Sequence, residues 1–244
     1  MKFYKHIINS ILSLIFPNHC IICGELMQNE NMNYVCIDCI NKNLNYIHKD
    51  EYIRCKKCGK VLENENSICI CKDEELYFDE CKSMLYYNNH TIDLIHKMKF
   101  SHRYLICKDF AAMLSYYYKD YIKNYDAVSF VPLGKNRLLE RGYNQSEIIA
   151  ETISKIINIK LIDDIIYRKK ETKALSSLNS KTERLNMIKN AFIVNHDYND
   201  YSEKINLLII DDVFTTGSTL NEISKEIKKL KCINKIGVLT AART

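Results

Sequence analysis

Four close pairs of cysteines occupy the first third of this 244-residue chain, and they constrain its fold more than any other feature. A gap of two residues lets a tight turn direct both thiolates at one ion, and two such turns supply the tetrahedral set of four sulfurs that zinc prefers. Twelve residues separate the first pair from the second, and ten separate the third from the fourth. The spacing therefore predicts an internal repeat of two zinc ribbons, with the ligands Cys20, Cys23, Cys36, Cys39, Cys55, Cys58, Cys69 and Cys71.

The role of this cysteine-rich region has two interpretations. A segment of its length has too little core to fold unaided, so zinc binding is expected to stabilise it. The ribbons then serve either as a structural unit or as a recognition surface for nucleic acid or a partner; the structural role is favoured, because no basic stripe stands out. Eleven cysteines cannot all enter a closed disulfide framework. Cys81, Cys107 and Cys232 lie outside the pattern and are expected to be buried.

The first 18 residues predict an amphipathic helix stopped by Pro17. Apolar residues recur at helical spacing between positions 7 and 16. Packing on the body of the protein is favoured over a membrane surface. No small-residue cleavage site follows, and the run is too short to span a bilayer. We therefore expect a cytoplasmic protein without a transmembrane span, and its net charge of +5 permits an anionic partner without demanding one.

The remaining two-thirds of the chain alternates between helical and strand patterns. Such alternation predicts a parallel sheet with helices on both faces. The predicted strands are 126–132, 161–167, 191–195, 204–210 and 235–241, and the predicted helices lie within 90–123, 144–158 and 218–231. The predicted units are an N-terminal helix (1–18), a double zinc-ribbon domain (19–80) and an α/β domain (81–244).

One junction carries the expected chemistry. A buried strand runs into Asp211 and Asp212, then into a loop of Thr and Gly residues, and then into a helix. Ligands of open α/β sheets bind at the carboxyl ends of strands, and a helix start with free N–H groups is a phosphate cradle. Paired carboxylates suit two adjacent sugar hydroxyls. A capping box of Thr219 and Glu222 is the alternative, but it leaves the repelling carboxylates unexplained.

Residues 208–220 resemble the phosphoribosyl-pyrophosphate signature of type I phosphoribosyltransferases, and the wider pattern resembles the ComF family of competence proteins. The further matching motifs are Phe16-Pro17, Lys97-Met98-Lys99-Phe100, Val131-Pro132-Leu133, Arg137-x-x-x-Arg141-Gly142-Tyr143-Asn144-Gln145, Arg184-x-Asn186, Ala191-Phe192 and Leu239-Thr240-Ala241-Ala242-Arg243. The resemblance spans nearly the whole chain. It implies a type I phosphoribosyltransferase-like domain behind the zinc ribbons.

The resemblance also implies the roles of individual residues. Asp211 and Asp212 would bind the ribose 2′ and 3′ hydroxyls and act as the catalytic residues of any transfer reaction. The 5′-phosphate would lie against Thr215, Thr216, Gly217, Ser218 and Thr219, and the pyrophosphate against Leu133, Gly134 and Lys135. Lys135, Arg137 and Arg141 add positive charge suited to a pyrophosphate, although a solvated basic loop stays open for Arg137. Mg²⁺ is expected with the ligand.

Two further basic segments have open roles. Residues 168–184 predict a basic flap that covers the ligand or contacts nucleic-acid phosphates. Lys97, Lys99, His102 and Arg103 form a second cluster, for which a solvated helix face is the favoured interpretation.

Three functions stay open. The first, implied by the resemblance, is a ComF-type protein that binds phosphoribosyl pyrophosphate or a related ligand and handles single-stranded DNA in natural transformation. Other competence proteins would be its partners, and it would work at the cytoplasmic face of the membrane. The second is a phosphoribosyltransferase of nucleotide metabolism with zinc ribbons as scaffold. The third is a non-catalytic ligand sensor that binds DNA.

Overall fold

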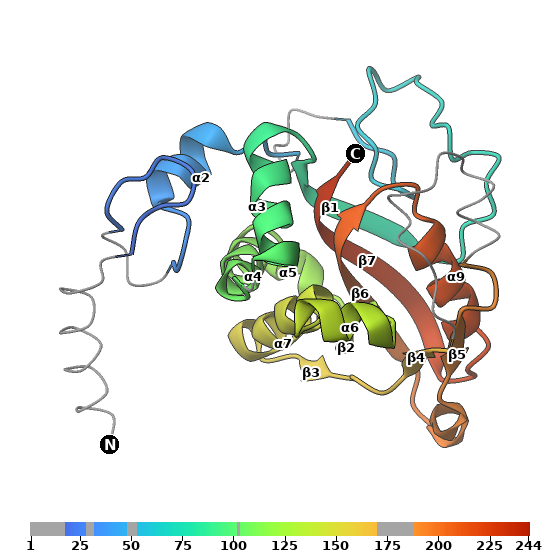
Figure 1. Cartoon of the computed structure of the whole chain (residues 1–244). Helices are drawn as coiled ribbons and strands as arrows, with labels where there is room; N and C mark the ends of the chain where they lie inside the picture. Colours follow the sequence, from blue (N-terminus) through green and yellow to red (C-terminus); the bar gives the residue numbers. More distant parts are fainter. Residues whose placement is uncertain (1–17, 28–31, 48–52, 102, 170–187) are drawn as a thin grey trace.

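The structure is a computed structural model that describes residues 18–27, 32–47, 53–101, 103–169 and 188–244. Its centre is a five-stranded sheet in the order β1–β7–β6–β2–β3, and all neighbouring strands in it are parallel (Figure 1). The strands are Glu80–Tyr86 (β1), Ala127–Phe130 (β2), Lys160–Leu161 (β3), Ile205–Phe214 (β6) and Ile233–Arg243 (β7). The predicted parallel α/β sheet is confirmed.

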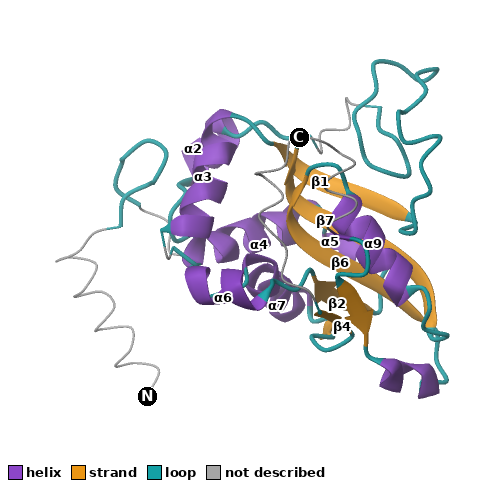
Figure 2. Ribbon diagram, turned by 45° about the vertical axis from the view of Figure 1, so that its right-hand side comes forward, coloured by secondary structure: helices purple, strands orange, loops and turns teal. Residues whose placement is uncertain are grey.

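Helices cover both faces of this sheet (Figure 2). Successive strand residues point to opposite faces. Leu208 and Ile210 of β6 therefore pack with one group of helices, whereas Leu207 and Ile209 pack on the other face. The first group is α3 (Asn89–Phe100), α4 (Leu105–Tyr117), α5 (Lys119–Ile122) and α7 (Gln145–Ile157), and the other face carries α9 (Ser218–Ile227).

Helix α7 is fixed at the edge of the sheet where its strands end. Asn144 is its N-cap, and the Asn144 side chain accepts a hydrogen bond from the backbone N–H of Ser146 at 3.1 Å. The amide group of Asn144 also donates to the carbonyl of Val131 at 3.0 Å, just beyond β2. These two bonds place the start of α7 beside the carboxyl end of the sheet.

The predicted strand over 161–167 is wrong as a single element. The run divides into β3 and a separate strand β4 (Ile166–Arg168), because the polar pair Asp163 and Asp164 interrupts it. Strand β4 pairs antiparallel with β5 (Phe192–Val194), so the predicted strand at 191–195 lies in a second, two-stranded sheet rather than in the parallel one.

Other elements differ in extent or were not predicted. Strand β6 does not end before the carboxylates but continues to Phe214, because β7 runs beside it and pairs Asp211 with Thr240. Helix α9 ends at Ile227, four residues earlier than predicted. The sequence patterns missed β1, the 3₁₀ helix His196–Asp200, and the helices α2 (Ile37–Asn43) and α6 (Lys135–Arg141).

The first ribbon, residues 18–47, contacts α4 and β1. Buried Asp109 of α4 accepts hydrogen bonds from the backbone N–H groups of Asn33 (2.8 Å) and Tyr34 (2.7 Å). The backbone N–H of Ile47 donates to the carbonyl of Met84 in β1 at 2.8 Å. A polar anchor and a strand contact therefore hold this ribbon on the α/β domain.

The second ribbon, residues 53–76, contacts the sheet at a different place. Arg243 at the end of β7 donates to the carbonyl of Cys58 at 2.7 Å. Gly59, with φ of +73°, lies so close to β1 that an added Cβ would stand 2.4 Å from the carbonyl oxygen of Cys81. Only glycine fits this turn, and it brings the ribbon against the edge strand of the sheet. The two ribbons thus contact the α/β domain separately, and the boundary near residue 80 stays a prediction.

Two sets of predictions remain: the isolated cysteines and the segments at the N-terminus and the flap. Cys81, Cys107 and Cys232 are buried, as predicted. The predicted N-terminal helix and nearly all of the basic flap at 168–184 lie outside the described residues.

Candidate functional site

A cavity of about 470 Å³ opens where β2 and β6 end. The predicted residues that line it are Leu133, Arg137, Arg141, Asp211, Asp212, Thr215, Thr216 and Thr219. The sequence interpretation did not assign the lining residues Tyr87, Lys99, Val131, Gln145, Ser146, Val213 and Thr244 to the site, whereas Arg168 is the first residue of the predicted flap. Residues far apart in the chain therefore meet at the edge of the sheet where ligands of such folds bind.

The carboxylates of Asp211 and Asp212 form one wall of the cavity. The hydroxyl of Ser146 donates to Asp211 Oδ1 at 2.9 Å, and the backbone N–H of Asp212 donates to the same oxygen at 2.9 Å. Burial, together with the neighbouring charge of Asp212, raises the pKa of Asp211 to about 7. Asp211 is therefore held in one orientation and can change its charge near neutral pH.

Lys99 at the end of α3 completes this wall. Its ammonium group lies 2.7 Å from Asp212 Oδ2, and only 21% of the Lys99 side chain and 14% of the Asp212 side chain are exposed. The prediction that the basic cluster around Lys99 is a solvated helix face is therefore wrong for this residue. The Lys97–Phe100 motif indicated that a lysine here belongs to the family pattern. Helix periodicity alone, however, does not tell which of the two lysines faces a neighbouring strand.

The backbone of α3 around Lys99 is held by two contacts. The hydroxyl of Tyr143 donates to the carbonyl of Met98. The guanidinium of Arg141 lies 5.3 Å from the ring centre of Phe100. Arg141 ends α6 and Tyr143 follows it, so residues after β2 fix the position of the lysine.

The loop from Thr215 to Thr219 forms a second wall. Gly217 has φ of +74°, and a Cβ there would stand 2.5 Å from the Phe214 ring, so the turn requires glycine. The hydroxyls of Thr216 and Ser218 lie 2.8 Å apart. Thr215, Thr216 and Thr219 line the cavity, whereas Gly217 and Ser218 line a separate hollow beside it.

The capping-box alternative is not formed at this loop. Gly217 is the N-cap of α9 and has no side chain to cap it, and the hydroxyl of Thr216 accepts one long hydrogen bond from the backbone N–H of Ser218 at 3.4 Å. Glu222 instead accepts a hydrogen bond from the backbone N–H of Asn190 at 2.9 Å. The first turn of α9 therefore keeps N–H groups that can bind an anion.

The third wall is basic. Arg141 donates to Gln145 Oε1 at 3.0 Å, while Arg141 Nε and Gln145 Nε2 are buried without a hydrogen-bond partner among the described residues. Buried unpaired donors cost free energy, and a ligand oxygen would satisfy them. Of the predicted pyrophosphate loop, Leu133 lines the cavity; Gly134 is the N-cap of α6 and Lys135 is its exposed first residue, and neither is among the lining residues.

The eight paired cysteines form two clusters, each of four sulfurs within 4.8 Å of one another: Cys20, Cys23, Cys36 and Cys39, then Cys55, Cys58, Cys69 and Cys71. Tetrahedral zinc with Zn–S bonds of about 2.3 Å needs sulfurs about 3.8 Å apart. The separations are 3.8 Å for Cys23–Cys36, 3.6 Å for Cys55–Cys71 and 3.4 Å for Cys58–Cys69. Both clusters fit structural zinc, including the tighter Cys69–Cys71 pair.

The turns also favour thiolates at the leading cysteines. Burial opposes ionisation of Cys20 and Cys55. Nevertheless, backbone N–H groups directed at the sulfurs, including those of Cys36 and Cys58, lower the pKa of each thiol to about 7. Zinc binds the deprotonated form, so the turns are arranged for the metal.

Within the part of the chain that the structure describes, every helix is too short or too polar to cross a bilayer.

Comparison with known families identifies the front of the chain. The model of the double zinc ribbon domain matches residues 11–74.

Relatives that match the chain are competence and DNA-utilization proteins. Competence protein F of Haemophilus influenzae is 33% identical over 165 residues, which cover 66% of this chain and 71% of the relative. Competence protein ComFC of Streptococcus pneumoniae is 28% identical over 227 residues, which cover 86% of this chain and 93% of the relative. DNA utilization protein YhgH of Escherichia coli K12 is 28% identical over 137 residues, or 54% of this chain and 58% of the relative.

Solved structures of phosphoribosyltransferases also match. A purine phosphoribosyltransferase from Pyrococcus horikoshii has a TM-score of 0.33 and 18% identity, and covers 56% of this chain and 80% of its own. The adenine enzyme of Thermoanaerobacter pseudethanolicus has a TM-score of 0.36 and 11% identity, covering 59% and 84%. Because these scores are low, the function proposed below rests on the site residues and the sequence relatives.

Proposed function

Because the chain belongs to the ComF family of competence proteins, we propose that it binds phosphoribosyl pyrophosphate in the cavity beside Asp211 and Asp212 and handles single-stranded DNA in natural transformation. The observation that carries the ligand proposal is the meeting of a carboxylate pair, a helix start with a glycine N-cap and a group of cations around one cavity of about 470 Å³. The competence role is supported by the names of its relatives.

Each part of the proposed ligand has a chemically matched wall. The ribose 2′ and 3′ hydroxyls donate to the carboxylates of Asp211 and Asp212. The 5′-phosphate accepts from the N–H groups and hydroxyls of the loop from Thr215 to Thr219. The pyrophosphate lies toward Arg137 and Arg141, where the unpaired Nε of Arg141 supplies a buried donor. Gly134 and Lys135 do not line the cavity. In this proposal they only begin α6, the helix that carries Arg137 and Arg141.

Lys99 adds a charge that the ligand can use. It forms an ion pair with Asp212. When the ribose hydroxyls take over the carboxylate, the ammonium group is free to turn toward a phosphate oxygen. Mg²⁺ would bind mostly through ligand oxygens and water, and it would neutralise part of the pyrophosphate charge.

Turnover, if it occurs, is transfer of the phosphoribosyl group. The bond from C1 to the pyrophosphate oxygen breaks, pyrophosphate leaves with the electron pair, and an acceptor nucleophile forms the new bond to C1. The two carboxylates would stabilise the developing positive charge on the sugar, and the cations would stabilise the leaving group. Release of pyrophosphate with a nucleobase separates an enzyme of nucleotide metabolism from a ligand sensor.

The place of action is part of the same proposal. Four-thiolate zinc sites of this kind need reduced cysteines, which the cytoplasm maintains. Incoming single strands reach the cytoplasm at the inner face of the membrane, where we place the protein and its partner competence proteins.

Calorimetric titration of phosphoribosyl pyrophosphate with Mg²⁺ into the zinc-loaded protein tests the ligand proposal. We expect saturable binding by the natural sequence and none by the Asp211→Asn, Asp212→Asn double variant, because an amide cannot supply the charge that the hydroxyls and Mg²⁺ require. The adjacent pair Asp163 and Asp164 lies outside the cavity lining, so Asp163→Asn with Asp164→Asn is the matched control. Unchanged affinity in the Asp211 and Asp212 variant, with its fold intact by circular dichroism, would refute the proposal.

A further inference from the structure

Two hollows of about 320 Å³ and 230 Å³ meet at the side chains of Arg54 and Lys82, which line both of them. Together they form one groove, here named the ribbon groove, between the second ribbon, the edge strand β1 and the corner where α4 meets α5. None of the residues that line it lines the cavity of Asp211 and Asp212. The ribbon groove is therefore a separate surface.

Positive charge gathers in the ribbon groove from three segments of the chain. Arg54 and Lys56 come from the second ribbon, Lys82 from β1 and Lys119 from α5. The groove has one acidic residue on each side, Glu80 and Asp120. These four cations outnumber the two acids, and the zinc-bound thiolate of Cys55, which also lines the groove, offsets part of the excess.

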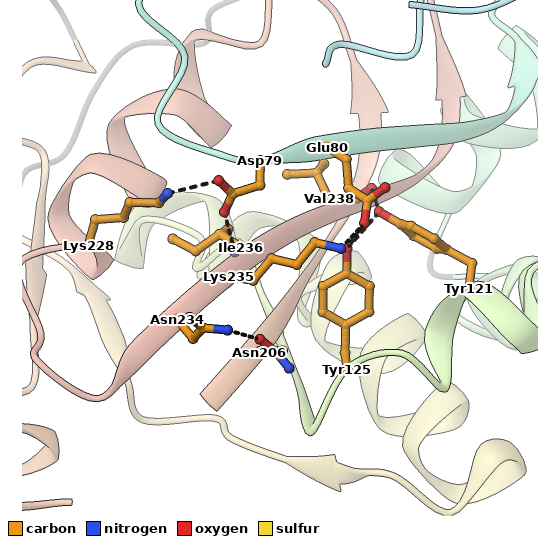
Figure 3. A network of polar contacts seen from close by, with 10 residues as sticks. All are labelled: Asp79, Glu80, Tyr121, Tyr125, Asn206, Lys228, Asn234, Lys235, Ile236 and Val238. Atoms are coloured by element: carbon orange, nitrogen blue, oxygen red, sulfur yellow. Dashed lines mark hydrogen bonds and ion pairs between the residues drawn. The ribbon is translucent and has the colours of Figure 1, made fainter. Parts of the chain in front are cut away.

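Glu80 is neutralised from outside the ribbon groove (Figure 3). It forms an ion pair with Lys235 and accepts a hydrogen bond from the hydroxyl of Tyr125 at 2.7 Å. Its charge is therefore shared between Lys235 and the groove. Burial lowers the pKa of Lys82; Glu80 opposes this shift, and the positive charges of Arg54 and Lys235 add to it.

The other wall of the ribbon groove is aromatic. Four tyrosines line it within six residues: Tyr116, Tyr117, Tyr118 and Tyr121, of which Tyr118 and Tyr121 are buried and support the others. Tyr116 is 80% exposed, and its ring lies 5.1 Å from that of Tyr117 in an edge-on arrangement. The ammonium group of Lys82 lies 4.3 Å from the ring centre of Tyr121. The hydroxyl of Tyr121 donates to the carbonyl of Val238, and its oxygen lies 3.1 Å from the hydroxyl oxygen of Tyr125, so this wall is held in place (Figure 3).

We propose that the ribbon groove binds single-stranded DNA, with the cations on its phosphates and the exposed ring of Tyr116 against its bases. Phosphates need cations along a groove, and unpaired bases need accessible ring faces, which is the combination found in proteins that bind single strands without sequence preference. Paired bases inside a duplex cannot reach the tyrosine rings. This inference rests on the proposed function, because it assigns a surface to the strand that the protein handles.

The test is fluorescence anisotropy of a labelled oligothymidine with the full zinc-loaded chain, between about 50 mM and 200 mM salt. Replacing Lys56 and Lys119 together by Gln should reduce the slope of log affinity against log salt by about 1.4, since each phosphate contact with a single strand contributes about 0.7. Tyr116→Ala should weaken binding about tenfold through lost stacking. Because these three side chains are exposed, the fold should be kept.

Matched control variants lie close by but outside the ribbon groove. Lys72 in the second ribbon and Lys123 at the end of α5 are exposed, and the Lys72→Gln, Lys123→Gln variant removes the same charge. Tyr201 is 47% exposed, and the ammonium group of Lys160 lies 5.6 Å from its ring centre. Tyr201→Ala therefore removes an exposed tyrosine ring with a neighbouring lysine at a site outside the ribbon groove. Both controls should bind the oligonucleotide as the natural sequence does.

The outcomes distinguish a wrong assignment of the DNA-binding surface from a wrong proposed function. Loss of binding in the groove variants, with phosphoribosyl pyrophosphate binding unchanged, supports the assignment. If the natural protein binds the oligonucleotide and the groove variants bind it equally well, the assignment is overturned while the proposed function stands. If the natural protein does not bind it at all, both the assignment and the DNA part of the proposed function are overturned.

Discussion

Replacing Lys99 by Gln removes the one cation that forms an ion pair with the carboxylate wall in the described structure. Lys99 lies 2.7 Å from Asp212, and most of both side chains is shielded from solvent. Gln keeps a polar end group but is one bond shorter than Lys and carries no charge. Two adjacent carboxylates then face each other with only the hydroxyl of Ser146 and a backbone N–H to offset them. We expect the variant to fold but to be less stable.

The size of the effect follows from the geometry. At 2.7 Å and an effective dielectric constant of about 20, the attraction is about 6 kcal/mol, and the desolvation of both ions offsets much of it. Breaking a fully buried pair costs about 3–5 kcal/mol, and this pair faces a cavity. We therefore expect a loss of about 2 kcal/mol at about pH 8, which corresponds to a fall in Tm of about 6 °C for a chain of this size.

The effect should depend on pH. The pKa of Asp211 is raised to about 7 in the folded protein, so its neutral form is favoured there and its contribution to stability is lost as the pH rises through that value. Removing Lys99 raises this pKa further, because the lysine charge lowers it in the natural protein. The stability difference between Lys99→Gln and the natural protein should therefore be smaller at about pH 5 than at about pH 8.

Urea unfolding followed by circular dichroism at both pH values measures this difference. Lys228 also forms an ion pair, at 3.0 Å with Asp79, but about a third of each side chain is exposed (Figure 3). Lys228→Gln is the control and should cost no more than about 1 kcal/mol. Adding Asp212→Asn to Lys99→Gln should restore part of the stability. An equal or larger loss at about pH 5, or no loss at either pH, would refute the reasoning.

Two further predictions concern zinc and the ligand. Elemental analysis should find two zinc ions per chain, falling to one in either Cys39→Ser or Cys71→Ser, because each cysteine belongs to a different four-sulfur cluster; one zinc or none in the natural protein would contradict this. Affinity for phosphoribosyl pyrophosphate should rise about tenfold between about pH 6 and pH 8, as Asp211 ionises through a pKa of about 7, and calorimetry should show a flatter profile for Asp211→Asn; parallel profiles for the two proteins would exclude Asp211 as the titrating group.

Local patterns in the sequence predicted the parts of the molecule that depend on neighbours along the chain. The cysteine spacing predicted both thiolate clusters, because a tight turn alone brings two sulfurs together. Buried strands read as continuous apolar runs, and the Asn144 cap marked the start of α7. The Thr and Gly residues after Asp212 likewise indicated the helix start and its glycine turn.

Contacts between distant segments decided the rest. Strand β6 continues through the carboxylates because β7, about thirty residues later, supplies its hydrogen-bond partners. The second sheet forms because β4 meets β5 across residues 169–191 rather than joining the parallel strands.

The positions of charged side chains depended most on tertiary structure. In sequence, Lys99 is one of two lysines near the end of a helix, and Arg54, Lys82 and Lys119 are scattered. Packing directs Lys99 into the cavity and gathers the others beside four tyrosines. The sequence alone determined which residues could bind metal and phosphate, because those sites are built from adjacent residues in turns. Only the tertiary structure decided which cations face them. A long charged side chain can extend into solvent in many directions, and a distant segment that packs against it selects one of them.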